Sequence, residues 1–374
     1  MSAIYKKLEE VCEILDSRRV PITAKNRKTG IYPYYGANGL QDYVAEYIFD
    51  DELVLLAEDG GNFGSKERPI AYRVSGKCWV NNHAHVLKAK PLVNADYLCY
   101  ALMFYDTEGL VNGATRQKLT QTAMRQMMIP YRNMTEQLQI ADEINQVIRL
   151  IDKRKEELSL LDQLVKSRFI EMFGSGRYPT VIASEVCDFI TKGTTPPTGE
   201  ITEKYEIGMI PYLKVYNLSF TGELLFDNMP QYISADTHNK QLARSKVLPN
   251  DVLMNIVGPP LGKFSLVTDE FSEWNINQAI AIFRAKDRVL PRYLMAALMQ
   301  PNVLRPFLEQ AVGIRQLNLS LEQCRNLEFP LPPIEEQRAF VELSEQIDKS
   351  KLAVEKSLKQ LEILKKSLMQ QYFS

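Results

Sequence analysis

The chain has 374 residues, of which 45% are hydrophobic and 24% charged, a composition typical of a globular protein with two or three domains. Its formal net charge of −1 excludes nucleic-acid binding through bulk positive charge but allows a local DNA-binding face. No run of about 18 apolar residues occurs and the start, MSAIYKKLEE, lacks a signal-peptide pattern, so we expect a cytoplasmic protein. The 5 cysteines have no C-x-x-C spacing, which excludes a disulfide scaffold and a zinc finger.

Five pairs of motifs recur in the same order along the chain and predict two copies of one unit. The first pair is LEEVCEILDSRRVPIT (residues 8–23) with ASEVCDFITKGTTPPT (183–198). The others are NNHAHVLKAK (81–90) with INQAIAIFRAK (276–286), YLCYAL (97–102) with YLMAAL (293–298), GATRQKL (113–119) with GIRQLNL (313–319), and LVKSRFIEMF (164–173) with LKKSLMQQYF (364–373). The order indicates a pseudo-two-fold internal repeat.

Each copy begins with a globular part in which short β-rich runs alternate with Gly, Asn and Pro turns. ELVLLA (52–57) and DVLMNIVG (251–258) are examples. This alternation predicts mixed α/β (α+β) domains with substantial sheet.

Each globular part is followed by a segment that predicts one long helix. The first segment runs from Thr135 to about Phe173 without Pro or Gly, and the second follows PLPPIEEQ (330–337). Apolar residues recur every seventh position, as Ile144, Ile151, Leu158, Val165 and Met172, and as Phe340, Ile347, Val354, Leu361 and Leu368. The two stripes predict antiparallel helices that form a coiled-coil-like spacer and bury the stripes as core or partner interface. The predicted boundaries are 1–134 and 175–334 for the globular domains, and 135–174 and 335–374 for the helices.

Catalytic motifs are missing from the sequence. GPPLGKF (258–264) is one residue too short for a phosphate-binding loop, and Phe264 replaces the hydroxyl that would hold magnesium, so a turn or bulge is favoured. No Asp-x-Lys or Glu-x-Lys pair of a nuclease occurs, nor an Asn-Pro-Pro or Asp-Pro-Pro motif followed by an aromatic residue. On a strand, His83 and His85 would share a face and could hold a metal, but no third ligand is evident. We therefore expect no catalysis and no metal.

Ordered strings in both copies carry a family resemblance. In copy one they are YPYYGANGLQDYV (32–44), LLAEDGGNFG (55–64) and WVNNHAHVLKA (79–89), and in copy two KGTTPPT (192–198), IPYLKVYNLS (210–219), LPNDVLMNIVGPPLGK (248–263) and NINQAIAIFRA (275–285). PLPPIEEQ is also typical, whereas MIPYRNMTEQ (128–137) lacks the double proline. Over essentially its whole length the chain resembles the specificity (S) subunit of type I restriction-modification enzymes.

The resemblance implies that each globular part is a target recognition domain that reads one half of a bipartite, asymmetric site in double-stranded DNA. It implies that the helices fix the half-site spacing and dock methyltransferase (modification) subunits, two in number, with restriction/translocase subunits as further partners. S-adenosylmethionine, ATP and Mg²⁺ are then expected on the partners, with no cofactor in this chain and no membrane. The alternative is a coiled-coil interaction adaptor, which would confer no sequence preference.

Residue chemistry suggests which side chains contact DNA, because Arg or Lys reads guanine and Asn or Gln reads adenine. In copy one the candidates are Tyr35, Asn38, Lys66, Asn82, His83, Arg116 and Gln117. In copy two they are Lys192, Thr194, Thr195, Lys214, Asn217, Asn277, Gln278, Arg315 and Gln316.

Several of these candidates have an alternative structural role. For Asn82, Asn277 and Gln278, turn formation or buried hydrogen bonding competes with base contact. For the Gly-containing loops 113–117 and 313–316, phosphate contact competes with capping or salt-bridge roles. Tyr35 and its neighbour Tyr34 could stack on DNA, although aromatic packing under a loop is the commoner role.

Overall fold

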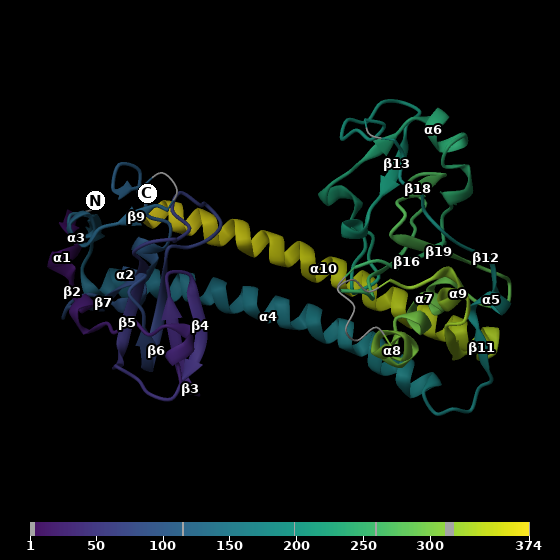
Figure 1. Ribbon diagram of the computed structural model, residues 1–374. Helices are drawn as coiled ribbons and strands as arrows, with labels where there is room; N and C mark the ends of the chain where they lie inside the picture. The colour runs from purple at the N-terminus through teal and green to yellow at the C-terminus, as the bar shows by residue number, and fades with distance from the viewer. Residues whose placement is uncertain (1–3, 114–115, 198, 259, 311–317, 374) are drawn as a thin grey trace. The chain divides into compact units, whose positions relative to one another are not determined.

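The computed structural model describes residues 4–113, 116–197, 199–258, 260–310 and 318–373. The chain folds as two compact units (Figure 1). Unit 1 comprises Met1–Arg154 and Ser357–Ser374, and unit 2 comprises Lys155–Lys356. The mixed α/β content predicted from the sequence is confirmed in both units.

Unit 1 begins with a strand, a one-turn helix and a second strand, and then forms most of its sheet. Its elements are β1 (Ile4–Lys7), α1 (Leu8–Val11), β2 (Cys12–Ile14), β3 (Thr29–Gly36), β4 (Gly39–Val44), β5 (Phe49–Ala57), β6 (Ala71–Val80), β7 (Ala84–Ala89), α2 (Ala95–Met103), β8 (Val111–Asn112), β9 (Lys118–Leu119), α3 (Gln121–Arg125) and β10 (Met128–Tyr131). The helix α4 (Met134–Phe173) follows.

The sheet of unit 1 has six strands in the order β2-β7-β5-β6-β3-β4. Its pairs are antiparallel except β3 with β6. Side chains of the central strand β5 alternate between the two faces: Val54 and Leu56 join the core beneath α2, whereas Leu53 and Leu55 join a second core with Val86. Burial on both faces explains the continuous apolar run at this strand.

Unit 2 follows the same plan with shorter strands. Its elements are β11 (Thr180–Ile182), α5 (Ala183–Val186), β12 (Cys187–Lys192), β13 (Ile210–Leu213), β14 (Tyr232–Ile233), α6 (Ala235–Asn239), β15 (Lys246–Val247), β16 (Val252–Asn255), β17 (Phe264–Leu266), β18 (Trp274–Ile276), β19 (Ile280–Ala285), α7 (Pro291–Leu298), α8 (Pro301–Gln310), α9 (Leu321–Arg325), β20 (Glu328–Pro330) and α10 (Ile334–Phe373).

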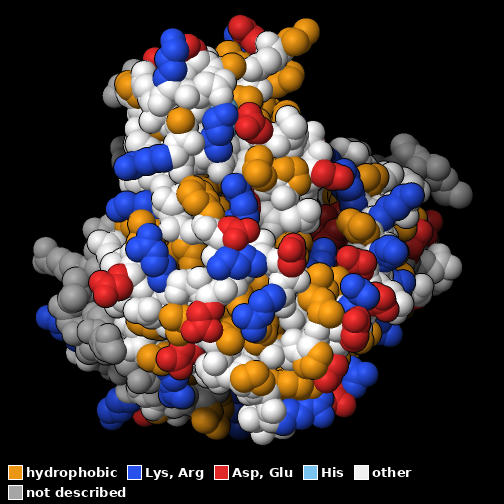
Figure 2. All heavy atoms as spheres, turned by 90° about the vertical axis from the view of Figure 1, so that its right-hand side faces the viewer, with side chains coloured by type: hydrophobic (Ala, Val, Ile, Leu, Met, Phe, Trp, Pro, Cys, Tyr) orange, Lys and Arg blue, Asp and Glu red, His pale blue; other side chains and the backbone are white. Residues whose placement is uncertain are grey.

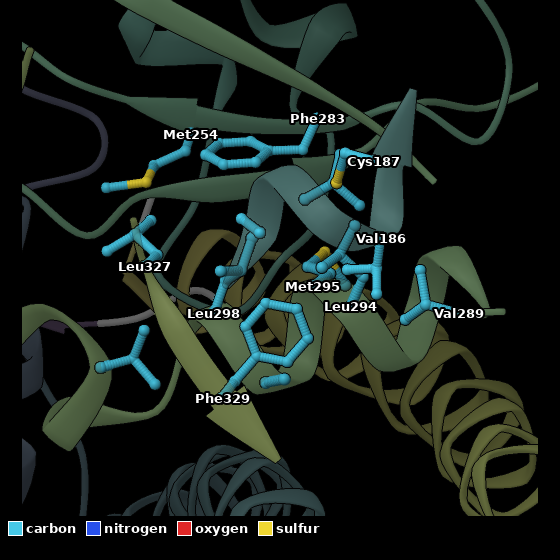
Figure 3. Packing of buried hydrophobic residues seen from close by; sticks show 14 of the residues in the cluster. Val186, Cys187, Met254, Phe283, Val289, Leu294, Met295, Leu298, Leu327 and Phe329 are labelled. Carbon is cyan, nitrogen blue, oxygen red and sulfur yellow. The ribbon is translucent and has the colours of Figure 1, made fainter. Parts of the chain in front are cut away.

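Unit 2 contains two four-stranded sheets, β12-β19-β16-β17 and β14-β13-β18-β15. Met254 on β16 faces the core beneath α7, whereas its neighbour Leu253 faces a core shared with Trp274. Figure 3 shows Leu298 of α7 and Phe329 of β20 packed beneath the sheet β12-β19-β16-β17, which carries Met254 and Phe283.

The internal repeat is visible in matching contacts. The ribbon β1–β10 in unit 1 corresponds to the ribbon β11–β20 in unit 2, and both are antiparallel. The hydroxyl of Tyr97 donates to the carbonyl of Pro130 at 2.9 Å, and that of Tyr293 donates to the carbonyl of Pro330 at 2.6 Å. Each bond joins a helix to the strand that leads into a long helix, so the duplicated motifs fold alike.

Both long helices have 40 residues. In unit 1, Ile144 and Ile151 of α4 share a core with Leu368 near the end of α10. In unit 2, Phe173 near the end of α4 lies 5.8 Å, between ring centroids, from Phe340 near the start of α10. Of the predicted stripe residues, six are buried and four are half-buried, the half-buried ones being Leu158, Val165, Met172 and Leu361.

No helix within the described residues combines the length and the apolar character needed to cross a membrane.

Candidate nucleic-acid interface

The turn between β6 and β7 lies at one end of the unit 1 sheet and is shaped by Asn81. Its Oδ1 accepts the backbone N–H of His83 at 2.8 Å, and its Nδ2 donates to Gln41 Oε1 at 3.1 Å. Asn82 is the exposed residue of this turn. The amide that forms the turn is therefore that of Asn81, and the Asn82 side chain is presented to solvent.

Asp59, just beyond the end of β5, joins two of the predicted DNA-binding residues. Its Oδ1 lies 2.6 Å from His83 Nδ1 and accepts a hydrogen bond from Arg116 Nη2 at 2.9 Å. Arg116 Nη2 also lies 3.3 Å from His83 Nδ1. Asp59 was missed in the sequence, where its signal is an acidic residue that follows a buried strand and precedes two glycines.

The backbone of Gly60 brings two further predicted residues to the same place. Asn38 Nδ2 donates to the Gly60 carbonyl at 3.0 Å, and the Gly60 N–H donates to the Gln117 carbonyl at 3.3 Å. Asn38, His83, Arg116 and Gln117 thus meet around Asp59 and Gly60, although they come from different loops.

The remaining predicted residues of unit 1 lie outside this group. Tyr35 is half-buried with its ring 5.9 Å from that of Tyr72, and burial raises its pKa. Tyr34 is buried, and its hydroxyl donates to the Ile22 carbonyl at 3.3 Å. Tyr34 therefore packs in the core, whereas Tyr35 packs against Tyr72 and stays partly exposed. Lys66 is exposed in the loop between β5 and β6.

A second polar network lies nearby around His85. Its Nδ1 is 2.7 Å from Asp16, and Glu58 pairs with Arg19 at 2.6 Å and with Lys118 at 3.0 Å. Burial tends to raise the pKa of both acids, but hydrogen bonds from His85 to Asp16 and from Arg19 to Glu58 hold each pKa below its usual value. His85, Asp16 and Glu58 bring possible metal-ligand atoms within 4.8 Å of one another. Because Arg19 and Lys118 already balance the two carboxylates, the group is an ion-pair network in this geometry.

The two histidines considered for a shared metal have separate partners. His83 precedes β7 and bonds Asp59, whereas His85 lies within β7 and bonds Asp16. The shared face that we expected depended on both residues lying in a strand, and the turn at His83 removes that condition.

In unit 2 the corresponding turn joins β18 to β19. Gln278 Oε1 accepts a hydrogen bond from Thr195 Oγ1, and Asn277 Oδ1 accepts the Ala279 N–H at 3.2 Å. A Cβ on Gly193 would lie 2.0 Å from the Asn277 carbonyl oxygen, so only glycine fits there. Gly193 and Thr195 are therefore packed closely against this turn.

Arg244 also joins this group in unit 2. Its Nε donates to Thr194 Oγ1 at 3.1 Å. Lys192 is exposed at the end of β12. Arg244 belongs to none of the motifs that carry the resemblance, and no spacing in the sequence connects it with Thr194.

Asn217 has a structural position in the fold. It is fully buried, its Oδ1 accepts the Lys214 N–H at 2.9 Å, and its Nδ2 donates to the Leu225 carbonyl at 3.2 Å. This amide is occupied in shaping a turn, so the geometry gives it no group to offer to a base. Lys214 is half-buried, and Arg315 and Gln316 lie outside the described residues.

The string that resembles a phosphate-binding loop connects β16 to β17. Asn255 Nδ2 donates to the Pro260 carbonyl at 3.0 Å, and its Oδ1 accepts the Lys263 N–H at 2.8 Å. Phe264 is buried in the core. The described residues of this segment therefore form a turn between two strands, one of the two forms predicted.

A cavity of about 700 Å³ lies elsewhere in unit 2, among α4, α7 and α10. Met295, Met299 and Phe169 form part of its apolar wall, and Lys351 and Asp162 lie in its polar part. None of the predicted DNA-binding residues that the structure describes lines it. The candidate interface is thus formed by the loops at the strand ends rather than by this cavity.

Two units of one plan, each with a polar turn at the end of a sheet and each containing the start of a 40-residue helix, define a duplicated α/β protein. The chain belongs to the family of the type I restriction modification DNA specificity domain, whose model matches residues 4–160 and again residues 180–363. The double match agrees with the internal duplication.

Curated relatives carry the same description. A putative type I restriction enzyme specificity subunit from Haemophilus influenzae, S.HindORF215P, is 38% identical over 136 residues, which are 36% of this chain and 35% of the relative. The EcoBI specificity subunit of Escherichia coli is 24% identical over 63% of this chain and 54% of its own length. The matches thus span about a third and about half of these two relatives. The MjaVIII specificity subunit of Methanocaldococcus jannaschii is 21% identical over 97% of this chain and 90% of its own length.

Solved structures show the same fold. A type I restriction-modification S subunit from M. genitalium superposes with a TM-score of 0.58 at 14% identity, covering 100% of this chain and 96% of that one. A chain from a study of complex assembly and conformational transition in the type I R-M system superposes with a TM-score of 0.57 at 16% identity. The superposition covers 99% of this chain and 97% of that one.

Proposed function

We propose that this chain is the sequence-specific DNA-recognition subunit of a type I restriction-modification complex and has no catalytic activity of its own. The observation that carries the proposal is the placement of different polar side chains at equivalent turns of two units. His83 occupies the turn in unit 1, and Gln278 occupies the matching turn in unit 2. Unlike readers on one fold suit an asymmetric site with two different half-sites.

Phosphate contacts supply much of the affinity of any DNA-binding protein. Figure 2 shows basic and acidic side chains interspersed over the drawn face of the molecule rather than gathered by sign. Together with the net charge of −1, this distribution supports a division of labour in which partner subunits contribute many of the phosphate contacts.

The helices α4 and α10 are the proposed spacer. A helix of 40 residues is about 60 Å long at about 1.5 Å per residue, a length suited to separating two half-sites on one duplex. In this proposal the two helices pair along their apolar stripes, fix the half-site spacing and dock two methyltransferase subunits. S-adenosylmethionine, Mg²⁺ and ATP belong to the partners, which include restriction subunits, and the complex acts in the cytoplasm.

The test is a gel shift of the full chain assembled with its cognate methyltransferase subunits, over a range of salt concentrations. A recognition subunit gives the complex a preference for one bipartite sequence that persists at moderate salt, because base contacts are less salt-dependent than phosphate contacts. An interaction adaptor would leave the complex without sequence preference, and that result would refute the proposal.

A further inference from the structure

Arg116 is a predicted DNA-binding residue that is exposed and also held by a side-chain hydrogen bond. Its Nη2 is hydrogen-bonded to Asp59, whose carboxylate is also held by His83. The three residues come from the loop after β5, the turn before β7 and the loop before β9. The guanidinium is therefore fixed by a carboxylate that is itself fixed.

Gly60 lies beside the guanidinium. It has a φ of +62°, a conformation that favours glycine, and a Cβ built there would be in ordinary van der Waals contact with Arg116, 3.4 Å from Nε and 3.5 Å from Nη2. The guanidinium therefore lies next to the backbone of this loop. The Arg116 side chain is still 60% exposed, which leaves it accessible to a ligand, whereas Asp59 is only 19% exposed.

The charge of Asp59 decides which part of DNA suits this site. A carboxylate directly bonded to the arginine partly neutralises it and repels a phosphate, so a phosphate contact loses its main source of affinity. A neutral acceptor on a base edge has no such penalty. The orientation of the guanidinium, which the carboxylate fixes, favours acceptors that lie in one plane.

Among base edges in the major groove, guanine displays two adjacent acceptors, N7 and O6, and arginine binds them with two parallel hydrogen bonds. We propose that Arg116 reads a guanine in the half-site of unit 1 and that Asp59 is its positioning residue. This proposal rests on the proposed DNA-recognition function, and it names both a base and the residue that selects it.

The first experiment uses the full chain assembled with its methyltransferase subunits and a library of DNA duplexes in which each position of the bipartite site is varied. Arg116→Gln should lower the preference for guanine at one position of one half-site by about tenfold and favour adenine there, because glutamine pairs with adenine N6 and N7. The other half-site should be unchanged. Equal weakening on all sequences would assign Arg116 to a phosphate, and unchanged binding would remove it from the interface; either result overturns the proposal.

The second variant, Asp59→Asn, separates positioning from folding. It removes a negative charge near DNA but leaves the arginine in place, so binding to non-specific duplexes should become tighter while the preference for guanine falls. Loss of structure would instead weaken both the binding to non-specific duplexes and the preference for guanine. Asp51→Asn is the matched control, since Asp51 lies on β5 towards its opposite end and pairs with Lys88 at 2.6 Å. Guanine preference that survives Asp59→Asn would overturn the positioning role.

The two proposals fail in different ways. If the wild-type complex shows no bipartite preference, the proposed function is wrong. If it shows one that Arg116→Gln leaves intact at every position, the function stands and the assignment of Arg116 is wrong.

Discussion

Gln137 in α4 and Gln337 in α10 make the same hydrogen bonds in the two units. Each is fully buried, and its Oε1 accepts one backbone N–H, from Asn94 at 2.8 Å or from Leu290 at 2.9 Å. Each Nε2 donates to two carbonyl oxygens, those of Leu92 and Arg132 in unit 1 and those of Arg288 and Pro332 in unit 2. One glutamine thus ties the loop before a short helix to the start of each long helix.

Replacing either glutamine should destabilise its own unit. Gln337→Ala leaves one buried N–H and two buried carbonyls without this partner, at a cost of about 1–3 kcal/mol for an unsatisfied group. Gln337→Glu should be at least as harmful, because a carboxylate cannot donate to the two carbonyls. Urea unfolding followed by circular dichroism measures the loss.

Gln163→Ala, at an exposed position of α4, is the control and should leave the free energy of unfolding nearly unchanged. A wild-type unfolding midpoint in Gln337→Ala would show that the bonds to this glutamine contribute no net stability.

The sequence predicted the features that depend on local periodicity. The seven-residue stripe identified both long helices, and buried positions such as Ile144 and Phe340 follow from it, because a helix repeats its face about every 3.6 residues. The duplicated motifs identified the equivalent turns at His83 and Gln278. Each of these signals lies within one short segment.

What the sequence did not predict depends on contacts between distant segments. Asp59 meets Arg116 across 57 positions, and Arg244 meets Thr194 across 50. Asn217 is buried because its side chain bonds the backbone of Lys214 and Leu225. Unit 1 has one six-stranded sheet and unit 2 has two four-stranded sheets, a difference in strand pairing that no local sequence pattern encodes.

His238 should make the stability of unit 2 depend on pH. It is fully buried, and its Nδ1 accepts from Asn275 Nδ2 at 3.0 Å. The orientation of that amide is fixed, because Asn275 Oδ1 accepts from Ser245 Oγ at 2.9 Å. Burial, together with nearby Lys246, lowers the pKa of His238 from its usual value of 6.5, although the Glu273 carboxylate, 3.3 Å from Nε2, acts in the opposite direction.

The sign of the effect follows from proton binding. Below pH 6.5 the His238 ring is protonated in the unfolded chain but stays neutral in the folded chain. The free energy of unfolding should therefore fall as the pH falls, by up to about 1.4 kcal/mol per pH unit, until the pH reaches the pKa of His238 in the folded protein. Urea midpoints measured between pH 7.5 and 5.5 should show this slope, and His238→Gln should reduce it. An equal slope in the variant would assign the pH dependence to other groups.

Arg284 and Asp251 form a two-bond ion pair in unit 2. Arg284 Nε donates to Asp251 Oδ1 at 2.8 Å, and Nη2 donates to Oδ2 at 2.7 Å. Asp251 is 1% exposed, so Arg284→Ala leaves a buried carboxylate without its cation and should cost about 3 kcal/mol. The double variant Arg284→Met with Asp251→Leu should be less destabilised than Arg284→Ala, because it removes the buried charge. Calorimetry on both proteins checks this order, and the reverse order would contradict it.

Gly193 should be essential for the second half-site. A Cβ there would lie 2.0 Å from the Asn277 carbonyl oxygen and 2.3 Å from that of Ile276, so Gly193→Ala must displace the turn that carries Gln278. We expect a loss of stability of about 1–3 kcal/mol, typical of overpacking, together with weaker selection at one half-site only. Gly199→Ala is the control, since Gly199 has a φ of +90° and a Cβ there would meet no atom within 4 Å, so the variant has backbone strain without the clash. Urea unfolding measures the stability of each variant, and the assembled methyltransferase complex on a library of varied sites measures its selection. A Gly193→Ala protein that is no more impaired than Gly199→Ala would show that the clash leaves the turn in place.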